Sequence, residues 1–230
     1  MDAWAVYRCA NPRCGLRFPA AVSEEPASCP RCHGPLQQQE RWPAPPRGAR
    51  PREGAPTRRA LVVENVRSAW NVGALLRIAD AAGYGRVFLV GITPTPEHPQ
   101  VAKTALGAQF TVRWSWHPNG VALLRTLRAL GWTLWALETA ATAAPLPVGQ
   151  GPPPEPWAWV VGNEVTGLDP AVLGLCHQVW RLPMQGAKRS LNVATAWAAA
   201  VYRLATPAAP AKAARVARGA RGPARSPSPP

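Results

Sequence analysis

The stretch ALVVENVRSAWNVGALLR, residues 60–77, decides the fold. Its first five residues, Ala60 to Glu64, are almost entirely apolar on successive positions, which is typical of a strand buried on both faces. Apolar residues then recur at helical spacing and predict a helix over residues 72–82. A buried strand that leads into a helix is the beginning of a parallel α/β unit.

The same alternation continues along the chain. Short apolar runs predict further strands at residues 86–90, 132–137, 157–161 and 178–182. Longer patterns predict helices at residues 100–106, 121–130, 170–175 and 191–204. We therefore expect an α/β fold, a parallel sheet with helices on both faces. No G-x-G-x-x-G follows the first strand, which argues against a dinucleotide site.

Polar residues cluster in three places where predicted strands end. The clusters are Asn71, Gly73 and Arg77; Gly162, Asn163 and Glu164; and Ser190 with Asn192. Ligand sites of open α/β sheets lie at these carboxyl ends, so the clusters predict one binding site. Each also has a purely structural interpretation, with Asn71 or Ser190 as a helix N-cap and Arg77 as a solvated side chain.

Four of the five cysteines fall in the first 32 residues. They form two close pairs, Cys9 with Cys14 and Cys29 with Cys32, beside turn-forming Pro and Gly. This spacing predicts a small structural Zn²⁺ site with four thiolate ligands, and the alternative is two disulfides. We expect reduced thiols, since no secretion signal is evident, and His33 is not needed as a ligand.

The charge is strongly basic, with 26 Lys and Arg against 12 Asp and Glu and a net charge of +14. Residues 61–202 carry ten basic and seven acidic residues, so most of the excess lies in the flanks. Both flanks are rich in Pro, Ala and Gly, which predicts a linker and a disordered tail. They act either as solvating arms or as additional contacts to RNA phosphates.

The chain shows no apolar run of about 18 residues and no signal-peptide pattern. We therefore expect a cytoplasmic protein. The composition favours a polyanionic partner, with nucleic acid as the first candidate.

The three polar clusters, in this order, resemble the three motifs of the SpoU (TrmH-like) family of SPOUT RNA methyltransferases. The resemblance is carried by ENVRSAWNVG at residues 64–73 with Arg77, VGNE at residues 161–164, and LPM at residues 182–184 with SLNVA at residues 190–194. It runs from about residue 60 to residue 204. It implies a C-terminal trefoil knot, a homodimer, S-adenosylmethionine as cofactor, and methyl transfer to a ribose 2′-hydroxyl of tRNA or rRNA.

The resemblance also implies roles for individual residues. Arg77 would act at the ribose hydroxyl, through electrostatic stabilisation because a guanidinium rarely gives up its proton. The other residues implied in catalysis and nucleotide placement are Asn71, Glu164, Ser190 and Asn192. Those implied in cofactor binding are Leu137, Gly162, Leu182, Met184 and Leu191.

The sequence thus predicts a zinc-ribbon-like module at residues 1–40, a basic Pro-rich linker at 41–59, a SPOUT methyltransferase domain at 60–205 and a disordered basic tail at 206–230. Two alternatives remain open. One is methylation of a base, which the intact Asn71, Arg77 and Asn192 argue against. The other is a catalytically silent RNA-binding or ribosome-assembly protein.

Overall fold

The computed structural model describes residues 3–43, 58–147 and 151–205. The chain divides into two compact units, residues 1–53 and 54–230, and each is described by itself. The domain boundaries expected from the sequence stay predictions. Most of the predicted linker, residues 44–57, and the predicted tail, residues 206–230, lie outside the described residues.

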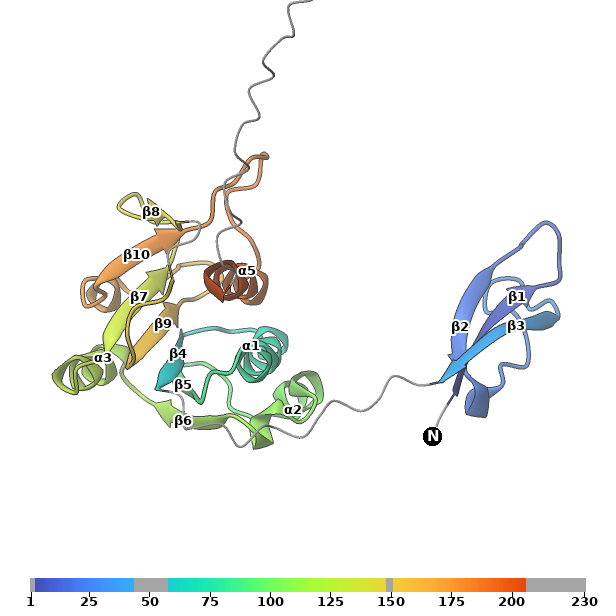
Figure 1. Ribbon diagram of the computed structural model, residues 1–230, viewed down its shortest axis with the longest axis horizontal. Coiled ribbons are helices and arrows are strands. Elements are labelled where there is room, and N and C mark those ends of the chain that lie inside the picture. Colours follow the sequence, from blue (N-terminus) through green and yellow to red (C-terminus); the bar gives the residue numbers. More distant parts are fainter. Residues whose placement is uncertain (1–2, 44–57, 148–150, 206–230) are drawn as a thin grey trace, which may run out of the picture. The chain divides into compact units, whose positions relative to one another are not determined.

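The N-terminal unit is a three-stranded antiparallel sheet with strand order β2-β1-β3 (Figure 1). Its elements are β1 (Ala3–Cys9), β2 (Arg17–Ala21), the short 3-10 helix η1 (Val22–Glu24) and β3 (Leu36–Pro43). Tyr7 and Phe18 face each other across β1 and β2 and stack with ring centroids 6.1 Å apart. The buried residues in this unit are few: Ala5, Tyr7, Cys9, Ala21 and Cys29.

The second unit is built on a seven-stranded sheet in which every pair is parallel, with strand order β6-β5-β4-β9-β7-β10-β8 (Figure 1). The strands are β4 (Arg59–Glu64), β5 (Arg86–Val90), β6 (Arg113–His117), β7 (Thr133–Leu137), β8 (Ala144–Pro145), β9 (Trp157–Val161) and β10 (Gln178–Arg181). The helices are α1 (Ala69–Ala81), α2 (Pro99–Ala105), η2 (Ala108–Phe110), α3 (Gly120–Ala129), α4 (Pro170–Leu173) and α5 (Val193–Ala205).

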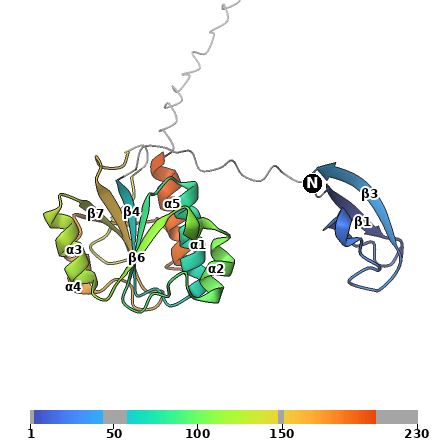
Figure 2. The same cartoon turned by 90° about the horizontal axis from the view of Figure 1, so that it is seen from below.

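Helices cover both faces of this sheet. Figure 2 shows α1, α2 and α5 on one side and α3 with α4 on the other. Successive strand residues alternate between the two resulting cores, as the pleat requires. In β4, Leu61 and Val63 pack toward α1 and α5, whereas Ala60 and Val62 pack toward α3 and α4.

A cluster of buried aromatic residues fills the core beneath α1 and α5. Trp135 contacts Trp157, Trp159 and Trp180 with ring centroids 5.5 to 5.7 Å apart, mostly edge to face, and Trp157 contacts Trp159 at 5.9 Å. Such contacts add to the large apolar area that each indole buries. The buried indoles are thus concentrated on the neighbouring strands β9, β7 and β10.

The predicted strands and helices form within a few residues of their expected bounds, and the sheet is parallel with helices on both faces. In the α/β unit two strands were missed, β6 and β8. β6 lies at the edge of the sheet and reads Arg113-Trp114-Ser115-Trp116-His117, so polar residues interrupt the apolar run. β8 has only two residues, and the trefoil knot stays a prediction.

The helix starts differ from the structural alternatives considered for Asn71 and Ser190. Ser68 is the N-cap of α1, and its hydroxyl accepts a hydrogen bond from the backbone N–H of Asn71 at 3.4 Å. At α5 the capping oxygen belongs to Asn192, which accepts from the N–H groups of Ala194 and Thr195. The N-cap interpretation was therefore wrong for Asn71 and Ser190, because the helices begin at different residues.

Gly73 has a packing role in the first motif. A Cβ atom at this position of α1 would overlap the Thr104 hydroxyl and lie 2.8 Å from the backbone N of Ala105. Only glycine lets α1 and α2 approach so closely.

Within the described residues, none of the helices has the length and apolar character needed to cross a lipid bilayer.

Candidate functional site

A pocket of about 450 Å³ lies where strands β7, β9 and β10 end. These strands are neighbours in the sheet, so their carboxyl ends meet at one edge (Figure 1). This is the usual place for ligands in parallel sheets, and the volume suits a nucleoside-sized molecule. The pocket is lined by all five residues predicted to bind the cofactor: Leu137, Gly162, Leu182, Met184 and Leu191.

Three of the five predicted catalytic residues line the same pocket: Glu164, Ser190 and Asn192. The structure thus brings together residues from the second and third motifs, which are separated by a whole strand and helix in the sequence. Asn71 joins them through hydrogen bonds. Arg77 is not among the lining residues.

The loop after β9 forms one wall of the pocket and depends on Gly162. A Cβ atom at Gly162 would lie 2.6 Å from the backbone N of Leu168 and 2.7 Å from the carbonyl carbon of Gly167. Both are backbone atoms, which cannot move aside as a flexible side chain would. The close turn from Asn163 to Gly167, which pair with each other, therefore requires glycine at position 162.

Glu138 is a pocket residue that the sequence interpretation missed. It follows β7, and its carboxylate accepts hydrogen bonds from the N–H of Leu168 at 2.9 Å and the N–H of Thr139 at 2.7 Å. It thereby ties the end of β7 to the loop after β9 across the mouth of the pocket. No motif contained it, because its partner lies 30 residues away.

A hydrogen-bonded network joins the three motifs. The side-chain amide of Asn71 donates a hydrogen bond to the Glu164 carboxylate at 2.8 Å. The side-chain amide of Asn192 in turn donates to the side-chain oxygen of Asn71, also at 2.8 Å. The Glu164 carboxylate also accepts from the backbone N–H groups of Arg67 and Ser68, at 3.0 and 3.1 Å. The start of α1 is thereby fixed to the pocket walls.

The network holds Glu164 in its ionised form. Partial burial alone would raise its pKa, but the N–H groups of Arg67 and Ser68 and the Asn71 amide stabilise the carboxylate, and the net effect lowers the pKa. Glu164 is consequently a negative charge at the pocket rim at neutral pH.

Arg77 lies on the exposed side of α1. It is six residues beyond Asn71, which is about 9 Å along the helix axis, and it points to a different side. It shares its exposed stripe with Trp70, seven residues earlier, whose side chain is 57% exposed. Within one chain, therefore, the predicted catalytic arginine and the pocket are not in direct contact.

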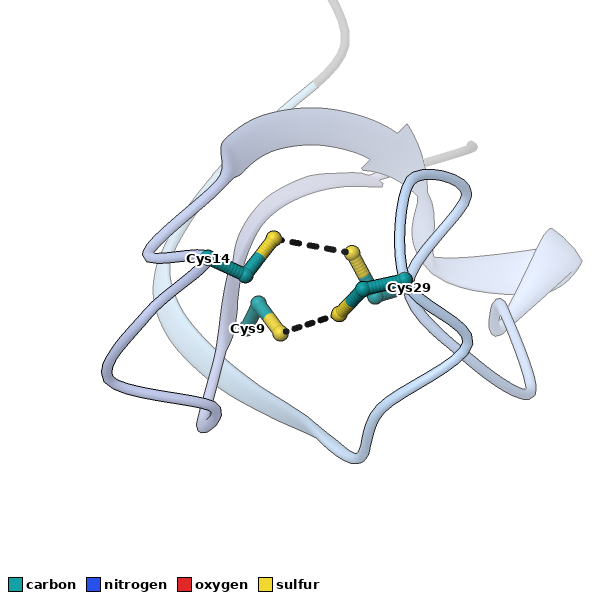
Figure 3. Close-up of side chains that lie close together, drawn as sticks. Cys9, Cys14 and Cys29 are labelled. Atoms are coloured by element: carbon teal, nitrogen blue, oxygen red, sulfur yellow. Dashed lines mark hydrogen bonds between the residues drawn. The ribbon is translucent and has the colours of Figure 1, made fainter.

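The four N-terminal cysteines converge although they come from separate turns. Figure 3 shows the thiols of Cys9, Cys14 and Cys29 directed toward one another. All four sulfur atoms lie within 4.8 Å of one another, with Cys9 to Cys32 at 3.4 Å and Cys14 to Cys29 at 3.8 Å. Four thiolates around Zn²⁺ at about 2.3 Å would lie about 3.8 Å apart. The donor set and spacing fit a tetrahedral metal site.

The four thiols differ in how easily they ionise, and burial raises the pKa of the Cys9 thiol to about 12. Burial also raises the pKa of the Cys29 thiol, but hydrogen bonds from the backbone N–H groups of Arg31 and Cys32 and from the Cys9 and Cys14 thiols together lower it to about 7. Gly34 packs beside this cluster, and a Cβ atom added at this position would lie 3.3 Å from the Cys32 sulfur. A metal could therefore displace a proton from Cys29 at neutral pH.

Comparison with known proteins places the site in a family. Residues 58–202 match the model of the SpoU rRNA Methylase family. These residues include the whole pocket and all three motifs, and they exclude the cysteine cluster.

Two curated relatives are 23S rRNA methyltransferases. The 23S rRNA (guanosine-2′-O-)-methyltransferase RlmB of Nitrosomonas europaea is 36% identical over 138 residues, 58% of this chain and 50% of the relative. The 23S rRNA (guanosine(2553)-2′-O)-methyltransferase RlmP of Bacillus subtilis is 32% identical over 152 residues, 65% of this chain and 59% of the relative. The chain spans about half the length of the curated relatives it matches.

Solved structures agree with the fold. An rRNA methyltransferase from Sinorhizobium meliloti, solved with bound AdoMet, superimposes with a TM-score of 0.58 at 26% identity. The superposition covers 68% of this chain and 57% of that one. The α/β unit is thus the part of the chain that is shared.

Proposed function

The chain belongs to the SpoU rRNA Methylase family, and we propose that it transfers a methyl group from S-adenosylmethionine to a ribose 2′-hydroxyl of RNA. The observation that carries this proposal is the pocket at the ends of β7, β9 and β10, whose lining includes all five residues expected to bind the cofactor. The names of the curated relatives favour ribosomal RNA over tRNA as the substrate.

S-adenosylmethionine supplies the methyl group from its sulfonium, which leaves as a neutral thioether. Backbone groups around Leu137, Gly162 and Leu182 would hold the cofactor in this pocket, with Met184 and Leu191 as apolar contacts. The open rim beside Glu164 and Asn192 is where the target nucleotide enters. Alignment of the hydroxyl with the methyl group is the main contribution of such a site to the rate.

The polar network positions the nucleotide. Asn71 is held between Glu164 and Asn192 by two hydrogen bonds of 2.8 Å, so its amide orientation is fixed. Ser190 and Asn192 lie at the pocket beside it and offer further donors and acceptors. During transfer the hydroxyl loses its proton as the new C–O bond forms, and a substrate phosphate is a suitable acceptor.

Arg77 acts from a second copy of the chain. It is exposed on α1, away from the pocket of its own chain, on the same stripe as the exposed Trp70. A homodimer that buries this stripe would cover Trp70 and bring a guanidinium to the partner's pocket. There it stabilises the negative charge that develops on the ribose oxygen.

The remaining expectations complete the proposal. Cys9, Cys14, Cys29 and Cys32 bind a structural Zn²⁺, for which their mutual distances are suitable. The C-terminal segment around β10 and α5 forms the trefoil knot, and the protein works in the cytoplasm. The N-terminal unit is a separate module joined through a basic linker.

The experiment is methyl transfer from labelled S-adenosylmethionine to unmodified rRNA and tRNA in separate reactions. The product is digested and examined for nuclease-resistant dinucleotides, which report 2′-O-methylation. We expect transfer to rRNA by the wild type and at least a 100-fold loss in Arg77→Ala, in the range seen when one charge-stabilising donor is removed. Cofactor affinity of Arg77→Ala should stay within about twofold, because none of the five residues expected to bind the cofactor is altered.

Gly162→Ala is the matched variant on the pocket side. It should lose cofactor binding, because the new methyl group overlaps the backbone of Gly167 and Leu168. Mixing Arg77→Ala with Gly162→Ala tests the shared site, since one of the two pockets in a mixed dimer is then intact. Recovery of activity in the mixture supports the dimer. Cofactor binding without transfer to either RNA contradicts the proposed substrate, and no cofactor binding favours the silent RNA-binding protein.

A further inference from the structure

The sheet of the N-terminal unit has one face that its own side chains leave open. Trp4, Val6 and Arg8 alternate along β1 with the buried Ala5 and Tyr7. Directly opposite them stand Pro19 and Arg17 on β2 and Trp42 on β3. We call these six residues, Trp4, Val6, Arg8, Arg17, Pro19 and Trp42, the ribbon face.

Two indoles form one end of the ribbon face. Trp4 and Trp42 are paired across β1 and β3, and their side chains are 36% and 39% exposed. Residues paired in this way have Cβ atoms about 5 Å apart. The core of the unit is filled without them, by Tyr7 stacked on Phe18. These two adjacent tryptophans keep more than a third of their surface open to solvent and are therefore available to a ligand.

Two guanidinium groups form the other end. Arg8 and Arg17 are paired across β1 and β2, and both are exposed. Arg17 reaches Glu40 at 4.0 Å, and this ion pair is so exposed that it holds the side chain only weakly. From Trp4 to Arg8 the face extends about 13 Å along the strand. The two indoles and the two guanidinium groups thus lie on the same face of the sheet, within this distance of one another.

We propose that the ribbon face binds single-stranded RNA, with bases stacked on Trp4 and Trp42 and phosphates held by Arg8 and Arg17. Indoles next to arginines are the combination that binds unpaired strands, since every base offers a stacking face and every nucleotide a phosphate. A duplex would keep its bases stacked inside and could not use the tryptophans. The inference rests on the proposed function in one respect, namely that the RNA bound by the ribbon face is the RNA that the enzyme methylates.

The sequence next to the face favours the same partner. β3 ends at Pro43, one residue after Trp42, and the residues that follow in the sequence, 44–53, contain three arginines and one glutamate. The sequence that directly follows Trp42 thus adds positive charge, which is complementary to RNA. An apolar protein surface would be less well matched, because Arg8 and Arg17 lie at one end of the face and further arginines follow Trp42 in the sequence.

The test measures, by fluorescence anisotropy, how tightly the full chain binds a fluorescently labelled, unstructured RNA oligonucleotide. Trp4→Ala with Trp42→Ala should weaken binding about tenfold or more, because each stacked base contributes about 1–3 kcal/mol. Trp4→Phe with Trp42→Phe should retain most of the affinity, since it keeps the aromatic faces. A duplex of the same sequence should bind more weakly and should be insensitive to either pair of changes.

The arginines have a matched control in the same unit. Arg13 and Arg31 are exposed in the cysteine turns, outside the ribbon face. Arg8→Ala with Arg17→Ala should lower the slope of log affinity against log salt by about 1.4, because each phosphate contact on a single strand contributes about 0.7. Arg13→Ala with Arg31→Ala removes the same charge and should leave the slope within about 0.3 of wild type.

Metal content and thermal unfolding of each variant show that the unit has folded. Binding that is unchanged in the double Trp→Ala variant would overturn the proposal, as would equal losses for the two arginine pairs. A change in oligomeric state with unchanged RNA affinity would also overturn it, in favour of a protein-docking face. Because binding is measured without methyl transfer, a failure here is distinguishable from failure of the proposed enzyme activity.

Discussion

The two units of this chain reach a defined structure by different means. The α/β unit buries a continuous set of large apolar side chains on both faces of a seven-stranded sheet. The N-terminal unit has three strands and a handful of buried residues, and its best-defined cluster is four thiols. A small unit with so little core usually needs a metal or disulfides to fold. We therefore expect packing to hold the α/β unit and the proposed metal ligands to hold the N-terminal unit.

The largest effect that this contrast predicts is loss of the metal. Cys29→Ser should remove bound Zn²⁺ and unfold the N-terminal unit, because metal binding in zinc-finger peptides supplies about 10–16 kcal/mol. The α/β unit should keep its thermal transition within about 2 °C, since it contains none of the four ligands. Metal analysis and limited proteolysis check the first part, and calorimetry checks the second.

Cys176→Ser is the control. Cys176 lies in the α/β unit and outside the cluster of four thiols, so this variant should keep one metal per chain. If Cys29→Ser retained the metal and resisted proteolysis like wild type, the N-terminal unit would be held by its apolar residues, and the contrast would fail.

The second prediction removes packing from the other unit. Trp159 is completely buried between Trp135 and Trp157. Trp159→Ala should lower the free energy of unfolding of the α/β unit by about 3–5 kcal/mol, because the cavity cannot collapse fully. The midpoint of thermal unfolding should fall by about 6–20 °C for a unit of this size.

The bound metal should be unchanged in Trp159→Ala, which would sharpen the contrast between the two units. Trp4→Ala, at an exposed tryptophan, is the matched control and should change stability by about 0.5 kcal/mol or less. A comparable loss at both positions would mean that burial does not distinguish the two tryptophans.

The two units also differ in how their structure follows from the sequence. In the α/β unit, apolar runs such as Trp157–Val161 lie in fully buried strands, and such strands were predicted correctly. β6 was missed because an edge strand buries less of its surface and mixes Ser115 and His117 with its tryptophans. Apolar periodicity reports burial, so it is weakest where the sheet ends.

For the site, the sequence predicted the residues of the pocket but not their connections. Leu137, Gly162, Leu182, Met184 and Leu191 line one pocket, and their binding of the cofactor stays a prediction. Glu138 could not have been found, since its role depends on the backbone N–H of Leu168, 30 residues away. Nor could pattern alone show that Arg77 faces away from the pocket of its own chain.

The smallest predicted effect concerns the polar network that fixes α1 to the pocket. Glu164 has a lowered pKa, so its ionised form stabilises the folded state above the ordinary Glu value of about 4.3. This contribution is lost as the pH falls through the lower pKa of the folded state. Glu164→Gln removes the charge and should lower the stability of the α/β unit at pH 7 by about 1 kcal/mol or less, since the carboxylate is solvent-exposed.

The pH dependence separates this network from the rest of the unit. Between about pH 5 and pH 3, wild type should lose slightly more stability than Glu164→Gln, whose side chain does not titrate. Denaturant unfolding of both proteins across this range measures the difference. Parallel curves would mean that the hydrogen bonds from Arg67, Ser68 and Asn71 do not favour the ionised carboxylate. The first two motifs would then be joined by packing alone, as the remainder of the α/β unit is.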